Sequence, residues 1–224
     1  MYVIVAGAGV LGFEVVRALV GRGHDVVVVD IDEASCERSY AELGATAIHG
    51  SATDIHLLEE AGARRADVVI AMMHRDSDNV ACALLARTLG VGRVIARMRD
   101  TGYEDSYRAA GVTHVVRATA VLRNQILAHI EHPRVSELMS VRGERVQIFA
   151  LEIPRGAAVA GRSVREVALH RGFPAKSLLL AAITPSGELE ILRGDGCLAA
   201  GDTILAMADA ADIERLTDVL TRPS

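Results

Sequence analysis

The chain has 224 residues, a formal net charge of −5 and only 3% aromatic side chains, none of them tryptophan. Half of its residues are hydrophobic, which is enough to bury a core, so a wholly disordered chain is excluded. The acidic balance and the scarcity of aromatic rings argue against a nucleic-acid partner, whose binding relies on basic side chains and stacked bases. No apolar run approaches the length that crosses a bilayer. The three cysteines are too far apart for a metal knuckle or a disulfide framework.

The first half of the chain alternates short apolar runs with segments of helical pattern. Predicted strands cover residues 2–6, 25–30, 46–49, 67–72, 93–97 and 113–116, and predicted helices cover 9–22, 33–43, 54–61, 76–89, 101–109 and 118–131. Such alternation is typical of a parallel sheet with right-handed crossovers and helices on both faces. We therefore expect a Rossmann-like, doubly wound α/β domain over residues 1–134.

The pattern changes after about residue 134, beyond the proline that interrupts the last of these helices. The elements expected there are strands at 145–152, 178–183, 188–192 and 203–208 and helices near 163–169 and 210–221. They predict a small α+β domain over residues 135–224 that follows the Rossmann-like one.

The segment Gly7-Ala8-Gly9-Val10-Leu11-Gly12 fits the pattern G-x-G-x-x-G, follows a predicted strand directly and opens a predicted helix. In this pattern the first glycine allows a tight turn, the second leaves room for a phosphate, and the third lets the helix pack closely on the strand. The helix N-terminus adds unpaired N–H groups and a partial positive charge. The motif therefore predicts a nucleotide site at Gly7, Gly9 and Gly12, with Val10 and Leu11 in the same turn. The alternative is a glycine-rich turn without a ligand.

An acidic residue, Asp30, ends the second predicted strand, 18 residues beyond Gly12, and Ile31 follows it. A carboxylate at this place accepts hydrogen bonds from ribose hydroxyls and repels a 2′-phosphate, which favours NAD over NADP. Asp30, Asp32 and Glu33 could also hold a hard cation. Ribose contact and helix N-terminal charge explain these carboxylates more simply.

Further polar positions follow the other predicted strands of the sheet. Ser51 and its neighbour Ala52 come after the third strand, residues 73–79 are polar after the fourth, and Arg97 ends the fifth. Because ligands lie at this edge of an open parallel sheet, these positions are candidate nucleotide contacts. The plainer alternatives are helix caps at Thr53 or Asp54, helix caps at Asp76 or Ser77, and an ion pair of Arg97 with Asp100 or Glu104.

Neither a metal site nor a catalytic set is predicted. His129 and His132 have i, i+3 spacing, but Glu131 is the only carboxylate nearby, so a solvated helix end is the simpler interpretation. The second domain shows no distinct set of residues that would bring a substrate and a proton donor to a nicotinamide. Binding without turnover is the leading expectation. An NAD-dependent oxidoreductase is the first alternative and a redox-sensing transcriptional regulator is the second.

Besides the glycine motif, both halves of the chain contain longer sequence motifs that follow one another in a fixed order. They lie at residues 3–12, 23–32, 50–54, 66–70, 79 and 94–100 in the first half, and at 161–166 and 199–205 in the second. On these patterns the chain resembles the TrkA/KtrA-type potassium-uptake regulatory proteins, also called RCK (regulator of conductance of potassium) proteins. The resemblance covers residues 1–221.

The resemblance implies a cytosolic, nucleotide-sensing regulatory subunit that gates a potassium transporter or channel. Such a protein is cytoplasmic and reaches the inner face of the membrane through a potassium-translocating partner of the TrkH or KtrB type. The resemblance also implies a homodimer, in some members an octameric ring, with the helix at 118–131 linking the subunits. It implies NAD(H), ATP, ADP or AMP at the first domain and, in some members, cyclic di-AMP between paired C-terminal domains.

By the same resemblance, Gly7, Gly9, Gly12 and Asp30 contact the nucleotide, and Ser51, Asn79 and Arg97 are further candidates. Two positions depart from the family pattern. Val10 stands where members that sense ATP often carry an arginine, and Ser51 stands where many members carry an aspartate or asparagine that faces adenine. These departures favour either NAD(H), ADP or AMP over ATP, or a pocket that binds nucleotides weakly.

Overall fold

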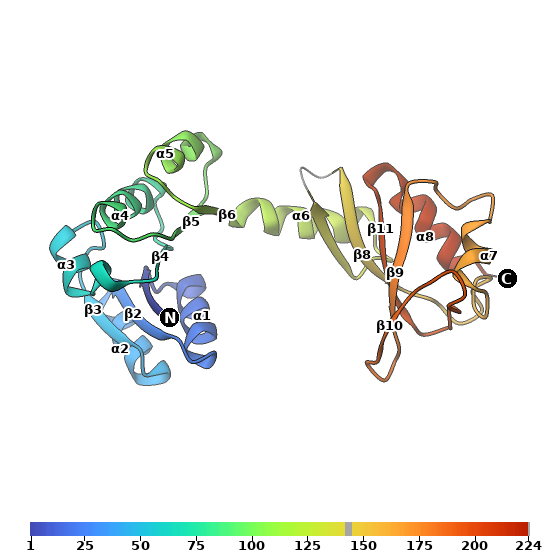
Figure 1. Cartoon of the computed structure of the whole chain (residues 1–224), viewed down its shortest axis with the longest axis horizontal. Helices are drawn as coiled ribbons and strands as arrows, with labels where there is room; N and C mark the ends of the chain where they lie inside the picture. Colours follow the sequence, from blue (N-terminus) through green and yellow to red (C-terminus); the bar gives the residue numbers. More distant parts are fainter. Residues whose placement is uncertain (142–144, 224) are drawn as a thin grey trace. The chain divides into compact units, whose positions relative to one another are not determined.

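The computed structural model describes residues 1–141 and 145–223, without the side chains of residues 124, 128, 137, 138, 140 and 141. The chain divides into two compact units, Met1–Val121 and Leu122–Ser224 (Figure 1). Each unit has its own core. The predicted domain boundary at residue 134 stays a prediction.

The N-terminal unit is built on a six-stranded parallel sheet. Its strands are β1 (Tyr2–Ala6), β2 (Asp25–Asp30), β3 (Thr46–His49), β4 (Val68–Ala71), β5 (Val94–Met98) and β6 (His114–Arg117). Their order is β3-β2-β1-β4-β5-β6, so the chain runs outwards from β1 on one side and then returns to add β4 on the other. This order is that of a Rossmann-like sheet, in which ligands bind where the strand order reverses, here between β1 and β4.

Helices cover both faces of this sheet. They are α1 (Val10–Gly21), α2 (Glu33–Leu43), α3 (Ile55–Glu60), α4 (Asp76–Thr88) and α5 (Glu104–Ala109), with 3-10 turns η1 (Ala63–Arg65) and η2 (Thr101–Tyr103). The helix α6 (Ala118–Glu131) follows β6, and most of it belongs to the C-terminal unit. Successive strand residues point to opposite faces. Val3 and Val5 therefore join the core beneath α1 and α2, whereas Ile4 and Ala6 join the core that includes Leu58 of α3 and residues of α4 and α5. Because both faces of the central strands β1, β2 and β4 are buried, these strands are almost wholly apolar, whereas the edge strands β3 and β6 are more exposed and more polar.

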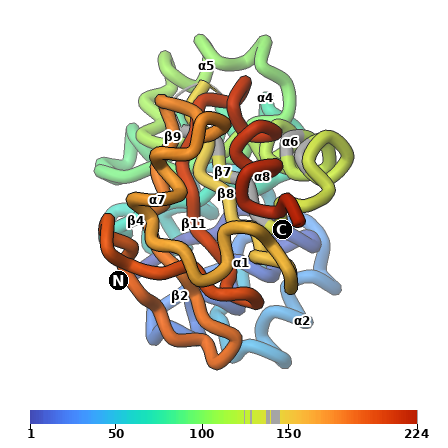
Figure 2. Tube along the Cα trace, turned by 90° about the vertical axis from the view of Figure 1, so that its right-hand side faces the viewer, coloured from blue at the N-terminus to red at the C-terminus, as the bar shows by residue number. Residues whose placement is uncertain are grey.

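The C-terminal unit contains a five-stranded antiparallel sheet. Its elements are β7 (Glu137–Val141), β8 (Val146–Glu152), α7 (Val164–Ala168), β9 (Ser177–Ile183), β10 (Leu189–Ile191), β11 (Thr203–Asp209), η3 (Ala210–Asp212) and α8 (Ile213–Thr221). The strand order is β10-β9-β11-β8-β7, and the trace in Figure 2 shows β9, β11 and β8 side by side. Ile213, Leu216 and Leu220 of α8 are buried against the sheet, where Phe149 and Ile204 lie in the same core. The predicted α/β and α+β fold classes are both confirmed.

Candidate functional site

Three glycines shape the loop between β1 and α1, and they have different reasons to be glycine. Gly7 has φ +98°, and a Cβ there would lie 2.9 Å from the backbone nitrogen of Met73. A Cβ at Gly12 would overlap the carbonyl oxygen of Gly7. Gly9 has φ −57°, which any residue adopts, and no atom lies within 4 Å of the place its Cβ would take. The fold needs Gly7 and Gly12, whereas Gly9 leaves an open space above the loop.

The N-terminus of α1 faces this open space without a cap. Gly9 is the residue before the helix. Among the described residues, no side chain accepts a hydrogen bond from the first N–H groups of α1, and the first turn of α1 contains no acidic residue. Val10 is 85% exposed and Leu11 is also exposed. Free N–H groups and the positive end of the helix dipole make this terminus complementary to a phosphate.

The carboxylate of Asp30 is held beside the same loop. One oxygen accepts the backbone N–H of Ala8 at 2.5 Å, and the other accepts that of Asp32 at 2.9 Å. Each oxygen keeps a further lone pair, so the carboxylate can still accept hydrogen bonds from a ribose. The side chain of Asp32 instead caps α2 by accepting from the N–H and the hydroxyl of Ser35. The hydroxyl bond from Ser35 is the main cause that lowers the pKa of Asp32.

Arg38 of α2 is a residue that sequence reasoning missed. Its guanidinium donates to the carbonyl oxygen of Ala8 at 3.2 Å and lies over the ring of Phe13 at 4.2 Å from the centroid. The peptide groups of Ala8 are therefore fixed on both sides, the N–H by Asp30 and the carbonyl by Arg38. No motif in the sequence marks this contact, because it depends on how α1 and α2 pack together.

Ser51 and Ala52 lie next to Asp30, since the N–H of Gly50 donates to the Asp30 carbonyl at 2.7 Å. The hydroxyl of Ser51 is 2.7 Å from that of Thr53 and stays partly exposed. The side chain of Ala52 is buried in the core, so only its backbone can meet a ligand. Ile31 is 72% exposed at the same edge.

Asp54 caps α3 by accepting from the N–H of His56 at 2.9 Å, as the alternative interpretation of this segment expects.

Asn79 is buried and holds the turn after β4. Its side-chain oxygen accepts from the N–H of Met73 at 2.9 Å, and its nitrogen donates to the carbonyl oxygens of Met73 and Arg97 at 3.2 and 3.0 Å. Both amide hydrogens are thus used inside the chain. The structure places Asn79 under the site, where it fixes the ends of β4 and β5.

Asp76 does not cap α4, so that alternative is wrong. It is the first residue of α4, preceded by Arg75, and its buried carboxylate accepts from the N–H groups of Arg99 and Asp100 at 2.9 and 3.0 Å and from the hydroxyl of Tyr107 at 2.8 Å. Burial acts to raise its pKa, but these hydrogen bonds outweigh burial and leave the pKa below its usual value. The same burial and the same carboxylate raise the pKa of Tyr107.

Arg97 is the penultimate residue of β5, and its cationic side chain lacks the carboxylate partners that the alternative interpretation gave it. Its Nε is buried without a hydrogen-bond partner among the residues that the structure describes. Glu104 pairs with Arg117, and Asp100 accepts from the N–H of Gly102. The alternative interpretation, an ion pair of Arg97 with either carboxylate, is therefore wrong. An unsatisfied donor of this kind fits an anionic ligand.

His129 and His132 do not form a metal site with other side chains. Over residues 1–141 and 145–223, no group of three His, Cys, Asp or Glu side chains could hold a metal ion. The same part of the chain contains no helix that is both long and apolar enough to span a bilayer.

Comparison with known proteins agrees with the fold. The family model for the TrkA-N domain matches residues 3–118 of the sequence, and the family model for the TrkA-C domain matches residues 148–221. The chain belongs to the TrkA-N domain family. It also contains a TrkA-C domain, so the resemblance to TrkA-type proteins is confirmed.

Several curated relatives carry the name Trk system potassium uptake protein TrkA homolog. The one from Methanothermobacter thermautotrophicus is 29% identical over 217 residues, which cover 97% of this chain and 98% of the relative. The one from Archaeoglobus fulgidus is 28% identical over the whole chain, which spans only 50% of that relative.

Solved structures with the same fold include the GsuK channel and the GsuK channel bound to NAD. The TM-scores are 0.68 and 0.65 at 20% and 21% identity, and in each case the whole chain matches 40% of the channel chain. The structure of GsuK bound to ADP matches 57% of this chain with a TM-score of 0.53 at 26% identity. In these comparisons the TrkA-N fold recurs in proteins whose structures contain NAD or ADP.

Proposed function

We propose that this chain is a cytosolic regulatory subunit that senses an adenine nucleotide and thereby gates a potassium transporter or channel in the membrane. The observation that carries the proposal is the open space above Gly9, bounded by the uncapped end of α1 and the fixed carboxylate of Asp30. The names of the TrkA relatives and the NAD and ADP of the GsuK structures support it.

Different residues of this site contact different parts of the nucleotide. The N–H groups at the start of α1 take the phosphates, as helix N-termini do. Asp30 accepts from the ribose hydroxyls, and the partly exposed guanidinium of Arg97 offers its positive charge to an anionic group. Val10 offers no charge to a terminal phosphate, which favours NAD(H), ADP or AMP over ATP.

A regulatory subunit needs two states that bind the nucleotide with different affinity, because only differential affinity shifts a conformational equilibrium. We propose that nucleotide binding shifts the subunit towards one of its two conformations. A potassium-translocating partner of the TrkH or KtrB type, bound at the inner face of the membrane, responds to that shift. The site offers binding groups but no distinct proton donor for hydride transfer, so turnover of the nucleotide is not part of the proposal.

Two experiments test the two halves of this function. Mass spectrometry of the purified, denatured protein should identify a co-purified adenine nucleotide, and a protein that neither retains nor binds any adenine nucleotide would refute the sensing half. Cells that lack this gene should take up potassium more slowly than the parent strain. Unchanged uptake would refute the transport half.

Replacing Arg38 by alanine should weaken nucleotide binding about three- to tenfold, because the carbonyl of Ala8 loses the donor that fixes the loop. Arg38→Lys should recover part of the affinity, since a lysine can still donate to this carbonyl. Isothermal titration with ADP and NAD measures both. Arg17→Ala is the matched control, because Arg17 lies over the same Phe13 ring, 5.2 Å from its centroid, but pairs with Glu14. An equal loss in Arg17→Ala would contradict a role of Arg38 in positioning the loop.

The helix α6 carries apolar side chains that the chain itself leaves exposed. Leu122, Ile126 and Ile130 are 60%, 61% and 70% exposed and recur every four residues, so they share one helix face. We propose that a second copy of this chain covers this face, which gives a homodimer and, through further contacts, an octameric ring.

The double variant Leu122→Glu, Ile126→Glu should shift the protein from dimer to monomer in size-exclusion chromatography with light scattering, because charges would have to be buried in the interface. Leu84→Glu on α4 is the control, since Leu84 is 53% exposed in a different element. A dimer that survives the double variant would place the interface elsewhere.

The resemblance to RCK proteins implies that the C-terminal domains of some members bind a second ligand. We propose, from the TrkA-C match, that paired C-terminal domains bind cyclic di-AMP. Titration with cyclic di-AMP should show one ligand per two chains, and the absence of any heat or shift in melting temperature would refute this proposal.

A further inference from the structure

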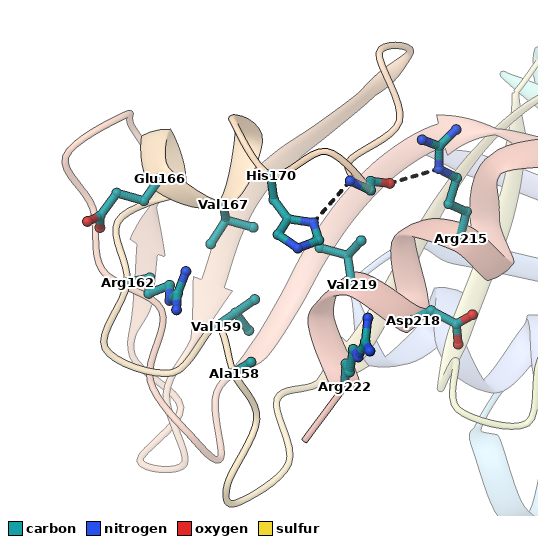
Figure 3. Close-up of a pocket in the computed structure, with 11 residues that line it drawn as sticks. Ala158, Val159, Arg162, Glu166, Val167, His170, Arg215, Asp218, Val219 and Arg222 are labelled. Carbon is teal, nitrogen blue, oxygen red and sulfur yellow. Dashed lines mark hydrogen bonds between the residues drawn. The ribbon is translucent and has the colours of Figure 1, made fainter. Parts of the chain in front are cut away.

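A cavity of about 280 Å³ opens at the surface of the C-terminal unit, beside α7 and α8 (Figure 3). Apolar side chains contribute much of its lining: Ala158, Val159, Val167 and Val219. Ligand pockets usually have volumes of about 300–1,000 Å³, so this cavity suits a molecule at the small end of that range. None of its residues belongs to the nucleotide site of the N-terminal unit.

Two arginines of the cavity are not held by a side-chain hydrogen bond. Among the residues that the structure describes, the guanidinium groups of Arg162 and Arg222 form no hydrogen bond and no ion pair within 4 Å, although the charge of Arg162 helps to lower the pKa of Glu166. In the view of Figure 3 these two side chains lie on either side of Val159. Arg215, the third arginine of the lining, instead donates to the carbonyl oxygens of Gly172 and Arg171 at 2.8 and 3.3 Å.

The acidic side chains of the lining form their hydrogen bonds and ion pairs with residues other than these two arginines. Glu166 accepts the N–H and the hydroxyl of Ser163, each at 2.8 Å, in the capping box of α7. Asp218 pairs with Arg134 at 2.6 Å. Both carboxylates point away from the space between Arg162 and Arg222 in Figure 3.

His170 adds a neutral donor to the lining. Its Nδ1 accepts the backbone N–H of Gly172 at 3.0 Å, so the proton of the neutral ring resides on Nε2. The two free guanidinium groups and this Nε2–H are donors. A ligand that complements them has only acceptors at its polar end, as a carboxylate or a phosphate has.

We propose that this cavity binds a small organic anion, with its apolar body against the valines and its charged group between Arg162 and Arg222. The cavity belongs to one chain and is too small for a dinucleotide, so it differs from a cyclic di-AMP site shared by paired domains. The site gives the regulator an input that is independent of the nucleotide.

Hexanoate is the probe for this proposal, because it combines a carboxylate with a short apolar body. Methyl NMR of the full chain, labelled at valine, should show saturable shifts at Val159, Val167 and Val219. Hexanol, which lacks the charge, should bind at least about tenfold more weakly. Equal binding of the alcohol, or no shift of these methyl groups with hexanoate, would overturn the proposal.

Variants distinguish hexanoate binding in this cavity from non-specific attraction of the anion to arginines on the surface. Arg162→Gln and Arg222→Gln should each weaken hexanoate binding about tenfold, whereas Arg193→Gln, at an exposed position outside the cavity, should leave it unchanged. Ala158→Leu should abolish binding by filling the cavity while it keeps both charges. An equal loss in Arg193→Gln, or full binding in Ala158→Leu, would contradict the assignment. ADP titration of the same samples should be unaltered, so failure here is separable from failure of the nucleotide site.

Discussion

Replacing Gly9 by alanine should leave the chain folded and lower its nucleotide affinity at least about tenfold. The backbone at Gly9 suits any residue, and its Cβ would meet no atom of the chain. A phosphate that approaches the start of α1 would meet that Cβ, and the charge-assisted hydrogen bonds to the helix N–H groups, roughly 1.5–3 kcal/mol each, would be weakened. Isothermal titration with ADP and NAD, together with thermal unfolding, measures both properties.

Gly12→Ala should give the opposite result and serves as the matched control. Its Cβ would overlap the Gly7 carbonyl oxygen, so α1 must move away from β1. Overpacking of this kind costs about 1–3 kcal/mol or more in the free energy of unfolding. If Gly9→Ala bound ADP and NAD as tightly as the parent protein, the space above Gly9 would not be the phosphate site. If Gly12→Ala were as stable as the parent, the packing described for the loop would be wrong.

Asp76→Asn should destabilise the N-terminal unit by about 1–3 kcal/mol at neutral pH. The carboxylate accepts three hydrogen bonds in a buried place, and an amide can match these donors with only one of its two polar atoms. Urea denaturation of the full chain, followed at the N-terminal unit, measures the loss. Asp105→Asn is the control, because Asp105 is exposed and, among the described residues, bonds only with Arg108 on the same helix.

Asp76 also makes the stability of the folded protein depend on pH in the acid range. The pKa of Asp76 is lowered in the folded state, so its contribution is complete above the ordinary value of 3.8 and is lost as the pH falls from there through the lower folded pKa. The parent protein should therefore lose stability more steeply below about pH 4 than Asp76→Asn does. Parallel curves for the two proteins below that pH would contradict the hydrogen-bond assignment.

The architecture of the N-terminal unit could be predicted because its strands are buried on both faces and its loops carry glycines or helix caps. Segment 2–6 is apolar throughout and segment 25–30 has four consecutive valines, and the turns that lead into α1, α2 and α3 carry a glycine or a helix cap. The glycine loop and Asp30 come together as their spacing indicates. Whether they bind a nucleotide is still a prediction.

Other features depend on contacts between distant parts of the chain. The edge strand β7 was missed because it has few local signals and is ordered by pairing with β8. Asp76 looks like a helix cap in the sequence, yet its carboxylate bonds with residues 23 to 31 positions away. Arg38 reaches the loop only because α2 packs beside α1, and the free arginines of the C-terminal cavity depend on which carboxylates are already paired.

The most direct measurement is a calorimetric titration of the purified chain, stripped of any co-purified ligand, with NAD, NADH, ADP, AMP and ATP. We expect at least one of the first four to bind saturably with one site per chain and more tightly than ATP, and we expect this binding to be lost in Gly9→Ala. If none of the five nucleotides bound the folded protein, the chain would not be a nucleotide sensor.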